Sequence, residues 1–364
     1  MKSVAAPIDA ISASAYTIPT DAPESDGTLE WNSTTLVLVE ARAAGTRGIG
    51  YSYANRATCV LIVDTLAKLV EGRDALDVAG AWRAMVAAIR NLGRPGISSM
   101  AIAAVDNALW DLKARLFDEP LVHLLGAARD AIPVYGSGGF TSYSNARLAE
   151  QLGGWARSGI GMVKMKVGRD PAADVARVRV AREAIGPDTA LFVDANGAYS
   201  RKQSLGFAAA YAELGVTWFE EPVVSDDLEG LRLIRDRAPA PMDIAAGEYG
   251  YDVVYFRRMC EAGAVDVLQA DATRCAGVTG FLRAAAVADS YHLPLSSHCA
   301  PSIHAHACCA TGARHLEYFH DHVRIERMLF DGALEPVQGA LHPAHDRPGF
   351  GLTFKAPDAR QYAV

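Results

Sequence analysis

The sequence lacks the patterns that would place the protein in a membrane, on nucleic acid or in a secretory pathway. No stretch approaches the about 18 uninterrupted apolar residues that a membrane span needs. Lysine and arginine number 35 against 42 acidic residues and form no basic stripe, so nucleic acid is not an expected partner. Pro7 and Asp9 interrupt the first apolar run, which therefore lacks the hydrophobic centre of a signal peptide. We predict a cytoplasmic protein.

Paired cysteine motifs are also missing. The six cysteines contain no CxxC pair, and the adjacent Cys308 and Cys309 suit neither a disulfide framework nor a zinc site. We predict reduced thiols that serve as small buried residues.

The composition that remains is that of a folded enzyme. Half of the residues are apolar and 21% are charged, which argues against disorder. A chain of 364 residues fits one large barrel with a smaller companion domain. Because the net charge is -7, an anionic substrate must be attracted by local positive charge.

The first part of the chain predicts a small α+β domain over residues 1–128. Residues 34–42, "TTLVLVEAR", alternate as a strand does and follow a polar loop at 19–33. Helical patterns then run from about residue 63 to 120. In the last of them, five apolar residues share one helical face: Ile102, Val105, Ala108, Leu109 and Leu112.

From about residue 130 short apolar strands alternate with amphipathic helices. Repeated βα units build a parallel sheet, and residues 129–340 hold enough of them to close a barrel. Polar residues follow each apolar run, where barrel enzymes keep their chemistry. Residues 341–364 are rich in glycine and proline and are predicted to pack back on the first domain.

One strand, within "GMVKMKVGRD" (161–170), carries two lysines. Lys164 and Lys166 are two residues apart, so in a strand they point to the same side of the sheet. Two like charges at close range are unfavourable unless anionic groups lie nearby.

Strand-end residues supply such anions. The residues that end successive strands are, in order, Lys164, Lys166, Asp194, Glu220, Glu248, Asp271, His298 and Glu317. Most are separated by about one βα unit, so each arrives on a new strand at the same height. Three consecutive strands thus offer carboxylates that converge, and three hard oxygen ligands suit Mg²⁺.

Each of these residues also has an ordinary interpretation. Taken alone, Asp194 would more often be a helix cap. Taken alone, His298 could be a buried core histidine whose hydrogen bonds are satisfied. Glu220 and Glu221 alone would be a polar loop entry, and Lys164 could extend to water. The shared spacing over six strands argues against independent accidents.

The chain resembles the enolase superfamily, in its mandelate racemase subgroup. The motifs that carry the resemblance are, in strand order, "KMK", "DAN", "FEEP", "GE", "DATRCAGVTG", "SSH" and "LEY", with "SMAIAAVDNALWDLKAR" ahead of the barrel. The resemblance covers nearly the whole chain. It implies a modified TIM barrel of (β/α)7β form, an N-terminal α+β capping domain and one Mg²⁺.

The resemblance also implies residue roles. Asp194, Glu220 and Glu248 correspond to the metal ligands. Lys166 corresponds to a base on one face of the substrate, and His298, held by Asp271, to an acid or base on the other. Glu317 resembles the group that hydrogen-bonds the enolate oxygen, and Lys164 the cation beside the substrate carboxylate.

Two protonation states are expected from these roles. Lys166 must be a free amine to act as a base, and the charge of Lys164 is expected to lower its pKa. Glu317 is expected to be protonated, so that it donates a hydrogen bond to the enediolate.

The expected reaction is removal of the α-proton of a carboxylate substrate. The resemblance favours dehydration of an acid sugar, an aldonate or aldarate, to a 2-keto-3-deoxy acid, with racemisation or epimerisation of a 2-hydroxy acid as the alternative. A Schiff-base aldolase using Lys166 and a non-catalytic sugar-acid binder are more remote alternatives.

Specificity is expected to lie in the capping loops, 16–31 and 50–57. The predicted substrate-binding residues are Lys164, Asn196, Arg274, Tyr51, Arg56 and Trp31. Tyr51 offers a hydroxyl for a polyol, and Arg56 a guanidinium for a distal carboxylate. By resemblance, the chain is expected to form a homo-oligomer, a dimer or an octamer.

Overall fold

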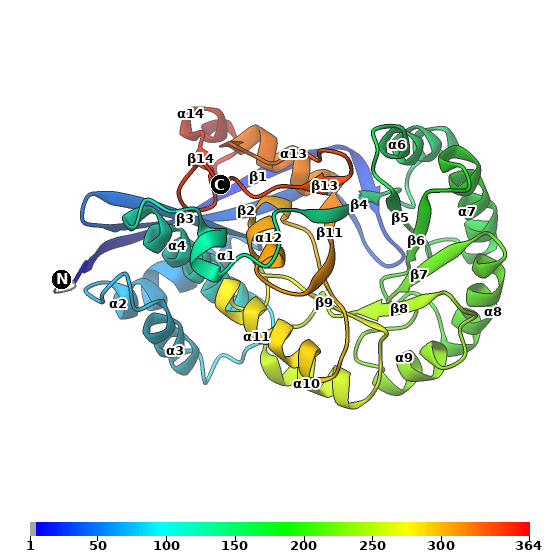
Figure 1. Cartoon of the computed structure of the whole chain (residues 1–364), viewed down its shortest axis with the longest axis horizontal. Coiled ribbons are helices and arrows are strands. Elements are labelled where there is room, and N and C mark those ends of the chain that lie inside the picture. Colours follow the sequence, from blue (N-terminus) through cyan, green and yellow to red (C-terminus); the bar gives the residue numbers. More distant parts are fainter. Residues whose placement is uncertain (1–4) are drawn as a thin grey trace.

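The computed structural model describes residues 5–364, as a capping domain beside a barrel (Figure 1). Residues 1–4, predicted to begin the first domain, lie outside the described residues. The predicted architecture is confirmed: a closed parallel barrel carries an N-terminal α+β cap.

The cap is built on a three-stranded antiparallel sheet. Its strands are β1 (Ile8–Ser25), β2 (Glu30–Ala43) and β3 (Thr46–Tyr53), in that order. The prediction of a polar loop at 19–33 is wrong for most of its length. Despite their polar sequence, β1 and β2 continue to pair beyond an irregularity between Pro19 and Glu24, which leaves only a short turn. The capping loop is therefore the tip of a long hairpin.

Helices cover this sheet and connect it to the barrel. They are α1 (Ala57–Leu61), the π-helix η1 (Ile62–Leu66), α2 (Ala67–Val70), α3 (Val78–Ala88), α4 (Ile97–Leu116) and α5 (Leu121–Leu125). The predicted helix at the end of the cap is confirmed as α4, and all five residues of its predicted apolar face are buried. Helix α4 packs on β2 and β3 and also on a barrel helix, so it fixes the cap relative to the barrel.

Eight parallel strands form the barrel. They are β4 (Ile132–Gly138), β5 (Met162–Lys166), β6 (Ala190–Asp194), β7 (Val216–Glu220), β8 (Asp243–Ala246), β9 (Val267–Ala270), β10 (Leu295–Ser297) and β11 (Ala313–Phe319). Each strand pairs with the next, and β11 pairs with β4, which closes the ring. Helices cover the outside of the ring and side chains fill its inside, so most strand residues are buried on both faces.

Helices surround this ring (Figure 1). They are α6 (Asn145–Arg157), α7 (Pro171–Ile185), α8 (Arg201–Ala212), α9 (Leu228–Arg235), α10 (Val253–Glu261), α11 (Gly277–Ser290), α12 (Pro301–Cys309) and α13 (His320–Leu329). Capping residues in the local sequence determine where several of these helices begin. Ser200 and Gln203 form a capping box at α8, and Asp252 accepts two backbone N–H bonds at α10.

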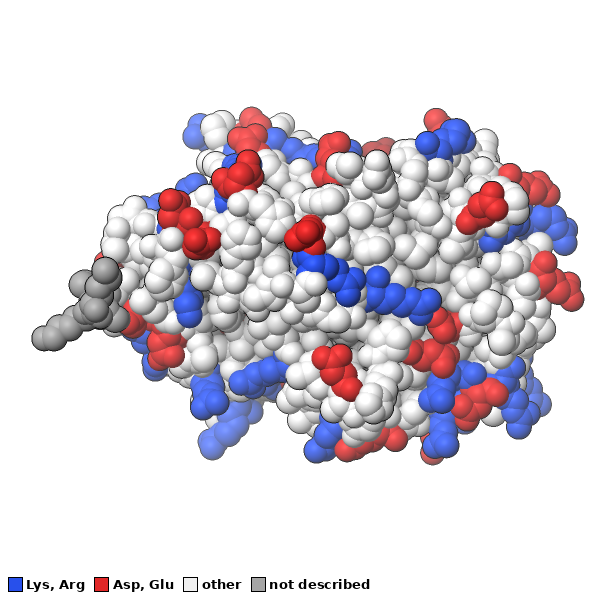
Figure 2. Space-filling model, viewed as in Figure 1, with Lys and Arg blue, Asp and Glu red and all other residues white. Residues whose placement is uncertain are grey.

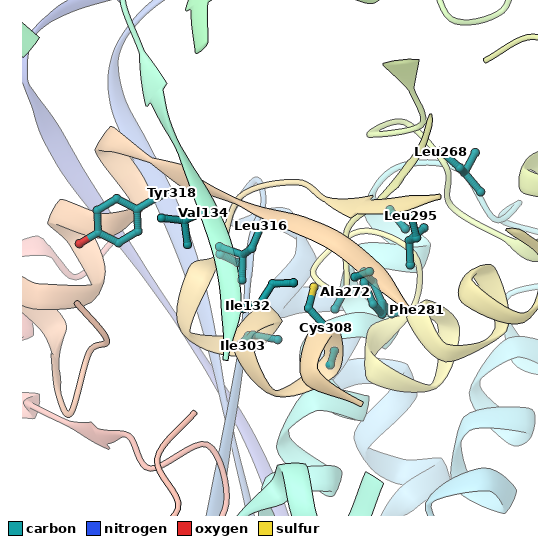
Figure 3. Close-up of a cluster of buried hydrophobic side chains, with 14 of the residues drawn as sticks. Ile132, Val134, Leu268, Ala272, Phe281, Leu295, Ile303, Cys308, Leu316 and Tyr318 are labelled. Atoms are coloured by element: carbon teal, nitrogen blue, oxygen red, sulfur yellow. The ribbon is translucent and has the colours of Figure 1, made fainter. Parts of the chain in front are cut away.

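The alternation predicted for β5 holds. Val163 and Met165 lie in the large core between strands and helices, whereas Lys164 and Lys166 point into the barrel, where both are buried. Below the lysines, a separate cluster fills the interior: Tyr135, Phe192, Trp218, Ala245 and Val267. Figure 3 shows the outer core near the closure, with side chains from β4 and β11 facing others on α11 and α12.

The C-terminal segment returns to the cap. It contains β12 (Phe330–Asp331), β13 (Ala340–Leu341), β14 (Thr353–Phe354), α14 (Ala356–Ala359) and the 3-10 helix η2 (Arg360–Tyr362). Val364 donates its N–H to the carbonyl of Ala15 in β1. This contact places the chain end against the outer strand of the capping sheet.

The surface in view carries acidic and basic side chains interspersed (Figure 2). Within residues 5–364, no helix combines the length and hydropathy needed to cross a membrane.

Candidate active site

Three carboxylates meet at the end of the barrel that faces the cap. Asp194 ends β6, Glu220 ends β7, and Glu248 follows β8. All three are buried, and one oxygen from each lies within 4.8 Å of the others. Because the strands are in register, with Asp194 opposite Glu220, their last side chains converge at one height.

This cluster fits a divalent cation of the magnesium type. Its donors are carboxylate oxygens, the ligands that Mg²⁺ prefers. The Oε2 atom of Glu248 is buried without a hydrogen-bond partner, as is the Oδ1 atom of neighbouring Asn196. Buried oxygens with unused acceptor capacity are normally satisfied by a partner, so this site has unmet capacity for a cation.

Lys164 lies beneath the cluster and is fully buried. Its Nζ is 2.6 Å from Glu220 Oε1, 2.8 Å from Glu317 Oε1 and 3.3 Å from Asp194 Oδ2. Burial by itself would lower the pKa of Lys164, but Glu220 and Glu317 hold it well above its usual value. Lys164 is therefore a permanent cation among carboxylates, which resolves the like-charge pairing of β5.

Lys166 lies nearer the cavity, and its pKa is raised overall, although the charge of Lys164 lowers it as expected. Burial and the charge of Lys164 each lower the pKa of Lys166. The negative charge of Asp194 outweighs them, so the net pKa is raised. The physical reason is proximity: the Nζ of Lys166 is 2.5 Å from Asp194 Oδ2, while three carboxylates surround Lys164. Lys166 can serve as a base only when the charge of Asp194 is taken up by another cation.

Glu317 is ionised, which corrects the expectation that it is protonated. Burial alone would raise its pKa, but Lys164 and then His298 hold it well below its usual value. Its oxygens accept hydrogen bonds from Ser137 Oγ at 2.6 Å and from the Cys299 N–H at 2.8 Å. These contacts fix the carboxylate in place.

His298 and Asp271 form a hydrogen-bonded pair. His298 Nδ1 lies 2.8 Å from Asp271 Oδ2, while Asp271 Oδ1 accepts from the N–H and hydroxyl of Thr273. Burial would raise the pKa of Asp271, but the hydrogen bond and charge of His298 hold it well below its usual range. An ionised Asp271 accepts from Nδ1–H, so His298 Nε2 is the atom left to exchange a proton.

A strained turn follows His298. Cys299 and Ala300 have φ angles of 53° and 40°, in the left-handed region that disfavours residues with a Cβ. His304 Nδ1 donates to the Cys299 carbonyl at 2.7 Å, and its Nε2 accepts from the Ala272 N–H at 2.8 Å. His304 thereby ties this turn to the loop that carries Asp271.

These groups open into a cavity of about 530 Å³ between the barrel and the cap. The barrel contributes Lys166, Asn196, Glu248, Arg274, His298 and Cys299 to its wall, and the cap contributes Asp26, Trp31, Thr34, Tyr53 and Asn55. Lys166 contacts Asp194, while His298 Nε2 lies 3.5 Å from Glu248 Oε2. The two proton-transfer candidates thus flank the carboxylate cluster from different sides.

Three predicted substrate-binding residues do reach this cavity. Asn196 lines it beside Asp194, to which its N–H donates. Arg274 lines it while it holds Glu248, with Nη1 at 3.2 Å from Oε1. Trp31 comes from the cap and donates its Nε1–H to Glu24 at 2.8 Å.

Two predicted substrate-binding residues, Tyr51 and Arg56, do not reach the cavity, and a third, Lys164, is buried below it. The hydroxyl of Tyr51 points away and donates to buried Glu326 Oε1 at 2.6 Å. Arg56 lines a separate hollow with Tyr16 and the chain end.

Replacing Tyr51 by phenylalanine should therefore affect folding and not substrate binding. Glu326 loses a buried donor, so the free energy of unfolding should fall by about 1–3 kcal/mol. Urea unfolding and steady-state kinetics would measure this. Tyr53→Phe is the comparison, because that hydroxyl makes only a 3.4 Å bond to a carbonyl while its ring lines the cavity. A raised KM with unchanged stability in Tyr51→Phe would contradict the structural role.

Several residues at the site were not identified from the sequence. Ser137, Thr273, Cys299, His304 and His322 each touch a site residue or line the cavity. Cys299 is a buried free thiol, as predicted for the cysteines, but its Sγ also lies 3.3 Å from His298 Nε2. Its position directly after the "SSH" histidine was the available signal.

Comparison with known proteins agrees with this architecture. Residues 18–126 match the family described as mandelate racemase/muconate lactonizing enzyme, N-terminal domain, and residues 146–359 match the family described as enolase C-terminal domain-like. A crystal structure of a mandelate racemase/muconate lactonizing enzyme-like protein from Rubrobacter xylanophilus is 54% identical, with a TM-score of 0.97 over 98% of this chain and 100% of that one. A racemase from Streptomyces coelicolor, crystallised with bound magnesium, is 29% identical, with a TM-score of 0.91 over 98% of this chain and 100% of that one.

Two relatives are named as enzymes that act on sugar acids. The L-talarate/galactarate dehydratase of Salmonella typhimurium is 31% identical over 87% of this chain and 80% of its own length. The 3,6-anhydro-alpha-L-galactonate cycloisomerase of Streptomyces coelicolor is 32% identical over 85% of both chains. The matches to both domains and this coverage identify the chain as a member of the mandelate racemase/muconate lactonizing enzyme family, within the enolase superfamily.

Proposed function

We propose that this protein is an Mg²⁺-dependent enzyme that removes the α-proton of a carboxylate substrate and dehydrates an acid sugar to a 2-keto-3-deoxy acid. The observation that carries the proposal is the arrangement of Asp194, Glu220 and Glu248 between Lys166 and His298. The name of the Salmonella dehydratase supports the dehydration, and the magnesium bound in the Streptomyces racemase supports the metal. Location in the cytoplasm and assembly as a dimer or octamer remain predictions.

The chemistry starts from a weak acid, the C–H bond beside a carboxylate. Asp194, Glu220 and Glu248 would hold Mg²⁺, which when bound supplies positive charge near the carboxylate oxygens that gain electrons. Lys166, as a free amine, accepts the α-proton on Nζ. Lys164 remains charged at the base of the site, where it offsets the carboxylates around it.

The second step expels a hydroxyl group. As the electrons of the enediolate return, the bond from the β-carbon to its oxygen breaks and that oxygen takes a proton from His298 Nε2, leaving as water. Asp271 keeps the imidazole oriented through its contact with Nδ1. The enol that remains becomes the 2-keto acid by gaining a proton at the β-carbon.

A screen of acid sugars for 2-keto acid product tests this function. With Mg²⁺ present, at least one aldonate or aldarate should yield product, and EDTA should abolish the reaction until Mg²⁺ is restored. Activity that persists in EDTA, or trapping of the protein with substrate by borohydride, would instead favour a Schiff-base enzyme using Lys166. Failure of every acid to exchange its α-hydrogen in D2O would indicate a binder without catalytic function.

The second candidate reaction is racemisation or epimerisation. It is favoured by the same placement of Lys166 and His298 on different sides of the cluster, because one group can remove a proton and the other return one. An inverted 2-hydroxy acid in place of a 2-keto acid in the same screen would identify this outcome.

A further inference from the structure

The two ends of the catalytic cavity differ in charge. At the carboxylate cluster, the wall contains Lys166, Arg274 and His298, each paired with an acidic side chain. On the cap side, the described lining residues include hydroxyl, amide, aromatic and aliphatic groups but no lysine, arginine or histidine. Among the described residues that line that side, Asp26 is the one with a charged side chain, an acid.

The arginines around the tip of the capping hairpin do not compensate. None of them lines the cavity, and each binds a carboxylate: Arg147 binds Asp21 at 3.1 Å, Arg169 binds Glu30 at 3.3 Å, and Arg324 binds Asp321 at 2.9 Å. Arg56, the residue expected to meet a distal carboxylate, faces the separate hollow beside β1. These arginines leave the cap side of the cavity wall without positive charge.

His322 does not supply this charge either. It lies on the barrel side of the wall, stacked on Tyr53 with ring centroids 3.4 Å apart. Burial lowers the pKa of His322 well below its usual value, and the nearby His298 lowers it further. The imidazole is thus neutral.

Asp26 makes the cap side unfavourable for a second anion. Its side chain is 7% exposed and accepts hydrogen bonds from the N–H groups of Thr28, at 2.6 Å, and Leu29, at 2.7 Å. These bonds fix the carboxylate in the wall. A like charge placed against it without a compensating cation loses affinity.

We propose that the substrate carries a single carboxylate, bound at the metal end, and an uncharged polyol end that faces the cap, as in an aldonate. This inference rests on the proposed function and narrows it. It separates the chain from its Salmonella relative, which is named for talarate and galactarate, both dicarboxylates. Thr34, Tyr53 and Asn55 line this side and are polar but uncharged. The hydroxyls of Thr34 and Tyr53 donate to Asp321 and to the His322 carbonyl, so toward a sugar hydroxyl they act as acceptors.

Matched pairs of acids test the inference. Galactonate with galactarate, gluconate with glucarate and arabinonate with arabinarate differ mainly in the distal carboxylate. We expect the monoacid of the reactive configuration to exchange its α-hydrogen in D2O with kcat/KM at least about tenfold higher than its diacid, a difference of about 1.4 kcal/mol. A diacid that reacts equally well or better would overturn the inference while leaving the proposed function intact. If no acid in a wider panel exchanges, the proposed function itself fails.

Variants of the cavity wall provide the second test. Leu29 lines the cavity at the hairpin tip and is 64% exposed, so its replacement should not unfold the protein. Leu29→Lys places a cation opposite the distal end and should reduce the preference for the monoacid by at least about threefold, whereas Leu29→Met, similar in length but uncharged, should leave the preference unchanged. Asp26→Asn should shift the preference in the same direction as Leu29→Lys. If neither charge change alters the ratio, the wall charge does not determine selectivity and the inference is wrong.

Discussion

Replacing Lys166 by alanine is expected to lower kcat/KM by about 10³-fold or more, because general-base catalysis contributes about 10²–10⁴-fold. The Nζ of Lys166 is the amine of β5 that lines the cavity, whereas Lys164 is fully buried beneath it. No neighbouring amine can therefore substitute. Product formation and exchange of the α-hydrogen with D2O should both be lost on the face that Lys166 serves.

His298→Asn is the companion variant that separates the two sides of the site. In this variant the rate of product formation should also fall by about 10²-fold or more, but exchange of the α-hydrogen by Lys166 should remain measurable. Asparagine keeps a polar group near Asp271, so loss of the folded structure around Asp271 is not expected to explain the loss of activity. Near-normal turnover in both variants would show that the site is assigned to the wrong residues.

Glu220→Gln is expected to weaken Mg²⁺ binding by more than about 100-fold, the upper range seen when groups that only support metal ligands are removed. Glu220 contributes one of the three oxygens of the cluster, and it also pairs with Lys164 at 2.6 Å. The substitution removes a ligand charge while preserving shape. Calorimetric titration with Mg²⁺, without substrate, measures the effect directly.

Glu221→Gln is the matched control. Glu221 is adjacent in sequence and equally buried, but it lies outside the three-carboxylate cluster. The Mg²⁺ affinity of this variant should stay within about tenfold of that of the unaltered protein, because Glu221 acts at most as a supporting group. Thermal unfolding without Mg²⁺ shows whether either variant is misfolded. Equal loss of Mg²⁺ binding in both variants would mean that the cluster is not the binding site.

The large features of this protein were predictable because they depend on short-range periodicity. Side chains alternate along a strand, and the strands of a barrel end at one edge, so the spacing of Asp194, Glu220 and Glu248 already placed them together. The apolar face of α4 followed in the same way from its helical spacing. The long hairpin of β1 and β2 did not, because cross-strand pairing stabilises residues whose own sequence favours a loop.

What the sequence determined by itself was the set of chemical groups and the barrel edge on which they lie. The tertiary structure decided their charge states and directions. Glu317 is ionised because Lys164 lies 2.8 Å away, a distance that no spacing predicts. Tyr51 serves the fold because its partner, Glu326, lies 275 residues further along the chain. The cap side of the cavity lacks a cation for the same reason: Arg147 and Arg169 meet Asp21 and Glu30, carboxylates that only folding brings near them.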